Sequence, residues 1–393
     1  MLRPRLASAL VLAVGAGGLG VDGVHAQAAC PFEVAVDSLR SAYGVPGMTA
    51  AWTLADGRGE TAASGLADVE AGVPMTLESR MLAASVGKTF VAAAAATLAA
   101  DGALDLDAPA ARWLGRRPPF DRIAHWDAVT LRHLLQHTSG LADHVHTEAF
   151  ARAFRDAGPD WAPAPDSLVA LVAEAEPLFA PGEGWAYSDT GYLVAGLVLE
   201  AAAGRPVEDV VARRVLRPLA LSHTAPSNRR AIAGLAAGYT SPDNPFGLPS
   251  KTTVGPGLMA WNPAVEGAGG GFASTSADLA RWGLALVTGR ALGDDALTEM
   301  LRAVPTGSGG QYGLGIAVTD GEHGTQLGHR GWVPGYVASL QVYPRYGLAV
   351  AFQVNTDVGM TDGEPPPVAA VERALVGTLA SCLGLAAQDS PDR

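Results

Sequence analysis

The stretch SVGKTFVAAAAATLAA at residues 85–100 is rich in alanine, contains no proline and is followed by Asp101-Gly102. Alanine has the highest helix propensity, and a glycine after the last apolar residue is typical of a helix end. We therefore predict a helix from Val86 to Ala100, with Ser85 at its first turn. Backbone N–H groups at the start of a helix favour negative charge, including charge that develops during a reaction.

Ser85 and Lys88 are three residues apart, so on this helix they lie on the same face. The chain has two lysines and 25 arginines, which suggests that lysine is kept where arginine cannot serve. A guanidinium stays charged in proteins, whereas burial readily shifts the pKa of an ammonium. The pair therefore predicts a serine nucleophile beside a lysine that can act as its base. The alternative is a surface lysine at a chance spacing, so other parts of the sequence must decide.

Length and composition describe an ordinary folded protein. The chain has 393 residues, of which 48% are hydrophobic and 17% charged, enough for one large domain or two interlocked ones. The net charge of -12 and the absence of a Lys/Arg cluster argue against nucleic acid or an anionic membrane as a partner.

The N-terminus has the pattern of a secretory signal at residues 1–26. Arg3 and Arg5 precede an apolar run, and cleavage is expected after Ala26 or Ala28. The alternative of a membrane anchor is disfavoured because the run is short and broken by glycine, whereas a span needs ~20 apolar residues. A lipidated Cys30 is disfavoured because the aliphatic residue usual three positions before it is missing. We expect a periplasmic or secreted protein with no stable membrane span after cleavage.

Export permits disulfides, and the two cysteines, Cys30 and Cys382, lie at opposite ends of the mature chain. If the terminal helices pack side by side, a bridge between them closes nearly the whole chain. The alternative is two independent thiols.

Apolar periodicity and turn residues divide the chain into strands at both ends and helices in the middle. A helix (31–43) and two strands (48–54 and 60–66) come first. The predicted helices of the middle are 131–137, 167–176, 190–203, 207–219, 276–287 and 295–304. Four late strands (312–318, 325–329, 336–343 and 348–354) and a closing helix (368–385) follow.

This order predicts an α+β fold in which the two chain ends build one antiparallel sheet flanked by the N- and C-terminal helices. We divide the chain into a discontinuous sheet domain (30–102 and 300–386) and an inserted, mostly helical domain with active-site loops (103–299). The helix that carries Ser85 would then lie at their junction.

Three short motifs carry a family resemblance. They are Ser85-Val86-Gly87-Lys88, Tyr187-Ser188-Asp189 and His329-Arg330-Gly331, and two further strings, HTSGL at 137–141 and GGFAST at 270–275, accompany them. In order and spacing the chain resembles the serine β-lactamase and penicillin-binding protein superfamily, in the branch of class C β-lactamases, D,D-peptidases, D-aminopeptidases and related esterases. The resemblance covers nearly the whole mature chain and implies the β-lactamase/transpeptidase-like fold.

The resemblance also implies site roles. Ser85 would be the nucleophile, and Lys88, held partly neutral by burial and neighbouring positive potential, would be its base. Alternatively, Lys88 would lower the pKa of Tyr187, whose phenolate would then be the base. The backbone N–H groups of Ser85 and Trp332 would form the oxyanion hole, next to the substrate-binding motif of His329 and Gly331. Neither a metal nor an organic cofactor is implied.

Asp189 departs from the family pattern, which has asparagine at this position. A carboxylate only accepts hydrogen bonds, so recognition of the substrate by a side-chain amide is in doubt. Asp189 would instead pair with Lys88, keep it charged and favour the Tyr187 route. The other interpretation is that Asp189 is simply the N-cap of the helix from residue 190.

His329 is a second departure, because β-lactamases generally have lysine there. The change removes a permanent cation that would attract a substrate carboxylate. Arg330 would replace this cation or else face solvent, since adjacent strand residues point to opposite faces. We therefore expect general ester or amide hydrolysis rather than efficient β-lactam turnover.

The motifs of other enzyme classes are incomplete or absent in this sequence. A phosphate-binding loop needs glycine where Leu82 stands, and there is neither a zinc-binding His-Glu-x-x-His nor a Gly-x-Ser-x-Gly. We interpret His133, His137, His144 and His146 as surface or hydrogen-bonded residues and Lys251 as solvated. The glycine-rich residues 267–271 are expected to form a tight turn beside the cleft, and residues 137–140 a turn that supports the site.

The sequence thus predicts an exported serine hydrolase that acts through an acyl-enzyme on a small-molecule or peptide ester or amide, of the esterase, D-aminopeptidase, D,D-peptidase or β-lactamase type. One alternative is a penicillin-binding or sensing protein that is acylated without efficient turnover. Another is a cell-envelope interaction protein with a degenerate site. Oligomeric state stays open.

Overall fold

A large antiparallel sheet holds the two ends of the chain together. The computed structural model describes residues 30–290 and 292–385, so the predicted signal at 1–26 lies outside the described residues. Nine strands of this part pair in the order β3-β2-β1-β14-β13-β12-β11-β10-β9. They are β1 (Gly47–Leu54), β2 (Gly59–Asp68), β3 (Val73–Pro74), β9 (Val304–Pro305), β10 (Gln311–Tyr312), β11 (Ala317–Gly321), β12 (Gly324–Val333), β13 (Tyr336–Tyr343) and β14 (Leu348–Val354).

The first and last long strands of the chain are neighbours in this sheet. β1 pairs antiparallel with β14 from Met48 opposite Val354 to Leu54 opposite Leu348. Both strands are buried over nearly their whole length, because helices cover the two faces of the sheet. A strand that is covered on both faces is expected to have apolar residues at consecutive positions rather than at every second position.

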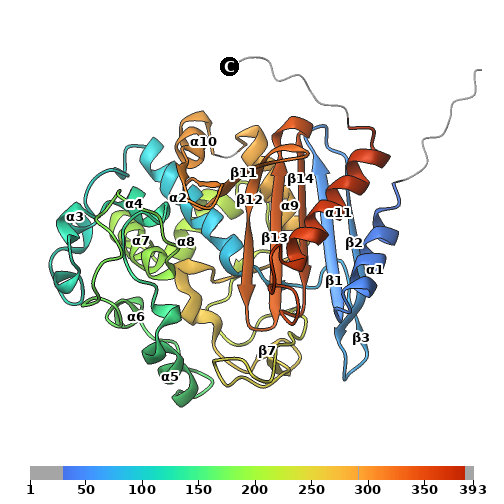
Figure 1. The fold of residues 1–393 in the computed structure, drawn as a ribbon, viewed down its shortest axis with the longest axis horizontal. Helices are drawn as coiled ribbons and strands as arrows, with labels where there is room; N and C mark the ends of the chain where they lie inside the picture. The colour runs from blue at the N-terminus through green and yellow to red at the C-terminus, as the bar shows by residue number, and fades with distance from the viewer. Residues whose placement is uncertain (1–29, 291, 386–393) are drawn as a thin grey trace, which may run out of the picture.

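Three helices cover the sheet (Figure 1). The N-terminal helix α1 (Phe32–Ala42) and the C-terminal helix α11 (Pro367–Cys382) lie side by side on one face, and α9 (Ser276–Thr288) packs against β1, β13 and β14. The α+β architecture with flanking terminal helices is therefore confirmed. The division into domains at 30–102, 103–299 and 300–386 stays a prediction.

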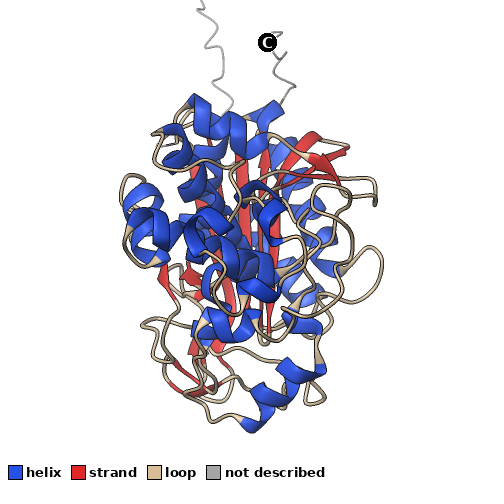
Figure 2. Cartoon of the chain, turned by 90° about the vertical axis from the view of Figure 1, so that its left-hand side faces the viewer, coloured by secondary structure: helices blue, strands red, loops and turns tan. Residues whose placement is uncertain are grey.

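Helices and loops of the middle of the chain lie beside the sheet (Figure 2). The central helix α2 (Gly87–Ala100) is buried from Gly87 to Leu98, which its small alanine side chains allow. Around it lie α3 (Ala111–Leu114), α4 (Leu131–Leu135), α5 (Glu148–Asp156), α6 (Pro165–Val169), α7 (Asp189–Ala203), α8 (Val207–Val211), the π-helix η5 (Ala212–Leu216) and α10 (Asp294–Leu301).

Several predicted elements differ from the observed ones in extent; for example, the strand predicted at 325–329 is the longer β12, Gly324–Val333. The strand predicted at 312–318 is instead β10, a turn and β11, because Gly315 has a φ of +66° and reverses the chain. The helix predicted at 167–176 is α6, which ends at Val169, because the chain continues in turns whose N–H groups bond carbonyls three residues earlier, as Leu171 does to Leu168 and Val172 to Val169.

Lys251 was predicted to be solvated, and this is also wrong. Its ammonium donates to both carboxylate oxygens of Asp68, at 2.7 and 2.8 Å, and lies 2.9 Å from Glu70. The pair ties the loop that carries Lys251 to the edge of the sheet. None of the helices in the described residues is both long and apolar enough to cross a bilayer.

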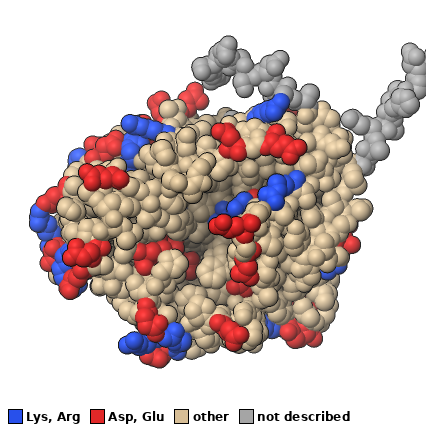
Figure 3. Space-filling model, in the orientation of Figure 1, with Lys and Arg blue, Asp and Glu red and all other residues tan. Residues whose placement is uncertain are grey.

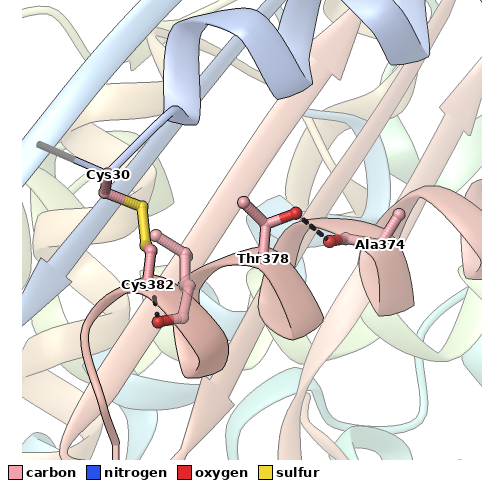
Figure 4. The surroundings of a disulfide bond; sticks show 5 residues. Cys30, Ala374, Thr378 and Cys382 are labelled. Carbon is pink, nitrogen blue, oxygen red and sulfur yellow. Dashed lines mark hydrogen bonds between the residues drawn. A yellow bond between two sulfur atoms is a disulfide. The ribbon is translucent and has the colours of Figure 1, made fainter. Parts of the chain in front are cut away.

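A disulfide joins Cys30 to Cys382, across 352 residues of sequence (Figure 4). Their Cα atoms are 5.2 Å apart, because α1 begins and α11 ends at the same end of the helix pair. The bond therefore closes a loop that contains nearly the whole described chain.

Candidate active site

Ser85 lies where a short strand turns into a helix. The strand β4 (Met81–Leu82) leads into the 3-10 turn η1 (Ala84–Val86), and α2 follows at once from Gly87. Ala84, directly before the serine, has a φ of +48°, a left-handed conformation that costs free energy in any residue with a side chain. This strained turn sets the direction in which Ser85 leaves the backbone.

Glycines allow three segments to converge on this turn. A Cβ added to Gly270 would lie 2.6 Å from the carbonyl of Ala84, and one on Gly87 would lie 2.9 Å from Phe272. A Cβ on Gly331 would overlap the carbonyl oxygen of Ala83. The glycine-rich turn and the strand β12 can therefore both touch η1, as the sequence analysis expected of residues 267–271.

Lys88 is fully buried and its ammonium has three acceptors. It lies 2.9 Å from Ser85 Oγ and 2.5 Å from the carbonyl oxygen of Gly269, and it forms an ion pair with Asp189 Oδ1. An ammonium has three donors, so all of them are used within the protein.

Asp189 occupies the first turn of α7. The N-cap of this helix is Ser188, whose hydroxyl accepts from the N–H of Gly191 at 3.2 Å. The interpretation of Asp189 as the N-cap is therefore wrong, and the alternative pairing with Lys88 is what the structure contains.

The charge state of Lys88 is not the partly neutral one that burial alone would give. Burial alone would lower the pKa of its ammonium, but the negative charge of Asp189 and its hydrogen bond to Lys88 outweigh burial and raise the pKa above its ordinary value. Lys88 is therefore an ammonium in the resting site, and the prediction that burial holds it partly neutral is wrong.

Tyr187 lies next to both residues. Lys88 Nζ is 4.9 Å from the centre of the Tyr187 ring. The buried Tyr187 hydroxyl is close enough to Lys88 and Ser85 for both to affect its pKa, but it forms no well-aligned hydrogen bond. Burial raises the pKa of Tyr187 to about 12 against the opposing effect of Lys88. The phenol thus keeps its proton at neutral pH.

The ring of His137 packs against the ring of Tyr187. The two rings are 4.2 Å apart between centres, and His137 Nδ1 accepts a hydrogen bond of 3.1 Å from the N–H of Ser188. Burial lowers the pKa of His137 well below its usual value, so the ring is neutral. The string at 137–140 therefore forms a supporting turn, as predicted.

His329 and Arg330 point in different directions from β12. The ring of His329 bonds the hydroxyl of Tyr312 at 2.9 Å, and burial lowers its pKa to about 4, so it carries no charge at neutral pH. Arg330 bonds both oxygens of Glu372 on α11, at 2.8 and 2.6 Å. Arg330 is thus already paired and does not replace the cation that His329 lacks.

Two cavities open beside these residues, and Figure 3 shows the face between the helices and the sheet hollowed, with both acidic and basic side chains near the hollow. The first, of about 60 Å³, is lined by Ser85, Asp189, Glu266 and Trp332, together with Phe150, Phe154, Phe246 and Trp261. The second, of about 490 Å³, is lined on the other side by Tyr187, Tyr312 and His329, among others.

Glu266 and the aromatic residues of the first cavity were not predicted from the sequence. They come from α5 and from loops far apart in the chain, without a shared motif, so no sequence signal grouped them. Trp332, by contrast, was predicted at the site. Its ring is 41% exposed over the cavity, and its Nε1 donates to Asp357 at 2.9 Å.

The remaining histidines do not form a metal centre. His144 is buried against Thr190, with 3.0 Å between Nδ1 and Oγ1, and His146 is exposed. Within residues 30–290 and 292–385, no three His, Cys, Asp or Glu side chains are placed to hold a metal ion together.

A serine at a strained helix start, bonded to a buried lysine one turn later, is the arrangement of a serine hydrolase that works without a histidine base. The Beta-lactamase family model matches residues 32–374, and the chain belongs to that family. It is a serine hydrolase of the β-lactamase-related type, as the motifs predicted.

The chain is similar to three proteins over different shares of its length. Esterase EstB of Burkholderia gladioli is 40% identical over 163 residues, which are 40% of this chain and 41% of the esterase. Penicillin-binding protein 4* of Bacillus subtilis (strain 168) is 27% identical over 332 residues, which are 80% of this chain and 68% of that protein. The structure of a D-stereospecific amidohydrolase from Streptomyces sp. has a TM-score of 0.69 and 31% identity, covering 83% of this chain and 94% of the other.

Proposed function

We propose that the protein hydrolyses esters or amides through an acyl-enzyme at Ser85. The observation that carries the proposal is the 2.9 Å contact between Ser85 Oγ and the fully buried Lys88 Nζ. This contact places at the nucleophile a nitrogen that can accept the serine proton once it has released one of its own, and the cavity that contains Ser85 gives a substrate access to it.

Lys88 receives the serine proton only after it has released one of its own. Asp189 is the acceptor, because its carboxylate already holds the ammonium in an ion pair. The Asp189 side chain is 23% exposed, so a substrate that covers it removes the remaining water. Loss of water weakens separated charges relative to a neutral amine and carboxylic acid, which favours transfer of the proton from Lys88 to Asp189.

Tyr187 is the proton donor to the leaving group. Its pKa of about 12 keeps the phenol protonated, and its hydroxyl is close to both Ser85 and Lys88. After the leaving group departs with this proton, Lys88 reprotonates Tyr187 and Asp189 returns its proton to Lys88. The Ser85 proton is thereby balanced by the one that the product carries away, and water then repeats the cycle to release the acyl group.

The oxyanion would be held by the backbone N–H groups of Ser85 and Trp332. The lack of a side chain at Gly331 supports this, because it lets β12 lie directly against η1. Two backbone N–H groups that point at the developing oxyanion commonly stabilise the transition state of acyl transfer.

In the described part of the chain, the residues around Ser85 offer no unpaired cation to an anionic substrate. Lys88 is paired with Asp189, and Arg330 beside the second cavity is paired with Glu372. Glu266, which lines the cavity with Ser85, has a pKa raised to about 8 and is mostly protonated at neutral pH. β-Lactams and D,D-peptides carry a carboxylate, so neutral or cationic esters and amides fit this site better. The names of the relatives, an esterase and an amidohydrolase, are in line with such substrates.

We also propose that the protein is exported to the periplasm or secreted. The supporting observations are the apolar N-terminal run and the disulfide between Cys30 and Cys382, since disulfides persist in oxidising compartments.

The test is mass spectrometry of the purified protein after exposure to a short-chain aryl ester, a penicillin and a D-Ala-D-Ala peptide. We expect an adduct on Ser85 that forms and clears with the ester. Persistent acylation by penicillin without turnover of any of the three would instead establish a penicillin-binding protein. Absence of any adduct on Ser85, including one from an activated-serine probe, would refute the proposal.

A further inference from the structure

The cavity at Ser85 contains a carboxylate that the catalytic proposal does not use. Glu266 belongs to the helical turn η6 (Pro263–Gly269) and lines the cavity together with Ser85 and Asp189. In the part of the chain that the structure describes, its carboxylate forms neither a hydrogen bond nor an ion pair. The nearest cation, Lys88, is already committed to Ser85, Asp189 and Gly269.

Asp143 adds a further negative group next to Asp189 and Glu266. One of its oxygens caps the turn η4 (His144–His146) by accepting from Val145 N at 3.2 Å. The other oxygen is buried and has no well-aligned hydrogen-bond partner, although the backbone N–H of Asp189 lies close enough to the carboxylate to lower its pKa. His146 Nε2 lies 4.0 Å away, beyond hydrogen-bonding distance. Asp189 and Asp143 thus both act on Glu266, and both raise its pKa.

The neighbouring acidic side chains raise the pKa values of Glu266 and Asp143. Burial, followed by repulsion from Asp189, raises the pKa of Glu266 to about 8, although Lys88 opposes the shift. The pKa of Asp143 is raised as well, by burial and by Asp189. A cation entering the cavity would relieve this repulsion, since opposite charges favour the ionised carboxylates.

The remaining wall of the cavity is apolar. Phe154 lies 5.2 Å from Phe246 and 5.8 Å from Trp261 between ring centres, and Phe150 and Val145 complete this wall. The cavity volume of about 60 Å³ is less than half of the ~150 Å³ that holds a benzene ring. The space therefore fits an apolar group of a few carbon atoms rather than a second aromatic ring.

We propose that the acyl part of the substrate is a small α-amino acid with a free ammonium group and a short apolar side chain. Its carbonyl lies at Ser85, its ammonium faces Glu266, and its side chain packs against the aromatic wall. This inference rests on the proposed function, because it requires Ser85 as the nucleophile. The Ser85 Oγ–carbonyl bond forms, the bond to the amine or alkoxide breaks, and that leaving group takes the proton from Tyr187.

The experiment compares alanine p-nitroanilide with a free amino group, its N-acetyl derivative and its N-succinyl derivative, in both enantiomers, at neutral pH. We expect kcat/KM to be at least about tenfold higher with the free amine than with the N-acetyl compound, and lowest with the succinyl compound. Glu266→Gln should reduce this ratio about tenfold. Glu183→Gln, an exposed residue outside the cavity, is the matched control and should keep the ratio.

A second measurement needs no variant. Inhibition of p-nitrophenyl acetate hydrolysis by alaninamide, N-acetylalaninamide and phenylalaninamide in the wild-type protein should be strongest with alaninamide. Equal inhibition by the first two, or an unchanged ratio in Glu266→Gln, overturns the ammonium site. Stronger inhibition by phenylalaninamide overturns the size limit. If the ester is hydrolysed through Ser85 without preference for the amine, the substrate inference fails alone, whereas absence of acylation refutes the proposed function itself.

Discussion

The Lys88 ammonium and the Asp189 carboxylate form a hydrogen-bonded ion pair, although the two residues are 101 positions apart in sequence. The pair joins the start of α2 to the start of α7. It fixes Lys88 beside Ser85 and, at the same time, determines the protonation state from which catalysis must begin.

Replacement of Lys88 by arginine separates charge from proton transfer. Lys88→Arg keeps a cation next to Asp189, but a guanidinium does not give up its proton. We expect Lys88→Arg to lose ester hydrolysis almost as completely as Lys88→Ala, by about 10³-fold or more. Ser85→Ala should abolish labelling by an activated-serine probe. Near-normal turnover by Lys88→Arg would disprove the role of Lys88 as the base.

Replacement of Asp189 by asparagine tests the proton acceptor. An amide accepts a hydrogen bond from Lys88 but not its proton. We expect Asp189→Asn to slow ester hydrolysis by about 10²-fold, because the proton of Lys88 then has no acceptor. The same change removes a negative charge from the cavity and should speed acylation by penicillin. Stopped-flow acylation rates with both substrates check this, and an unchanged penicillin rate would show that Asp189 does not exclude β-lactams.

The role of Tyr187 as a proton donor depends on the leaving group. An aryl oxide leaves without a proton, whereas an alkylamine needs one. Tyr187→Phe should therefore slow hydrolysis of an amide far more than hydrolysis of a p-nitrophenyl ester with the same acyl group. Acylation rates of the two substrates give the ratio. Equal losses would contradict a donor role and favour Tyr187 as the base.

Buried histidines make stability sensitive to acid. Burial lowers the pKa of His144 to about 4, from 6.5 in the unfolded chain, so the unfolded state binds more protons between these values. The stabilisation is present above pH 6.5 and is lost as the pH falls towards 4. At about 1.4 kcal/mol per pKa unit, His144 should account for a loss of about 2–3 kcal/mol between pH 7 and 4.5.

The measurement is urea unfolding of the wild type and His144→Asn at both pH values. The variant should lose less stability on acidification than the wild type. His146→Asn is the control, because the side chain of His146 is 81% exposed, and it should behave as the wild type does. An equal acid sensitivity of His144→Asn and the wild type would contradict the assignment.

Loss of the disulfide should affect stability but not catalysis. Replacement of Cys30 and Cys382 by alanine releases a constraint across 352 residues, for which a loss of about 2–5 kcal/mol is expected. Thermal unfolding measures the loss. Because the bond joins α1 to α11 and contacts none of the residues around Ser85, kcat/KM of the folded variant should be unchanged.

Local patterns in the sequence were sufficient for most of the fold. The apolar runs at 48–54, 336–343 and 348–354 became adjacent strands, and the terminal helices pack side by side, because burial on a sheet imposes these patterns. The strand predicted at 312–318 failed, since the effect of a single glycine with positive φ, Gly315, depends on context that an apolar run does not reveal.

The site was predictable only where a motif existed. Ser85, Lys88, Tyr187 and Trp332 were located from short strings, and the structure brings them together around one cleft. The charge on Lys88 was not predictable, because it depends on a distant carboxylate rather than on burial. Glu266 was missed for the same reason, since its environment is created by residues from other loops.

The pairing of β1 with β14 has a consequence for biosynthesis. A nascent chain that ends before residue 324 already contains Ser85 and Lys88, but it lacks β12 with Trp332, and it lacks β13 and β14, which join β12 to β1 in the sheet. Contacts between residues so distant in sequence form late in folding. A ribosome-bound intermediate of this protein would therefore be catalytically silent, and hydrolysis would begin only once translation has delivered the last strands.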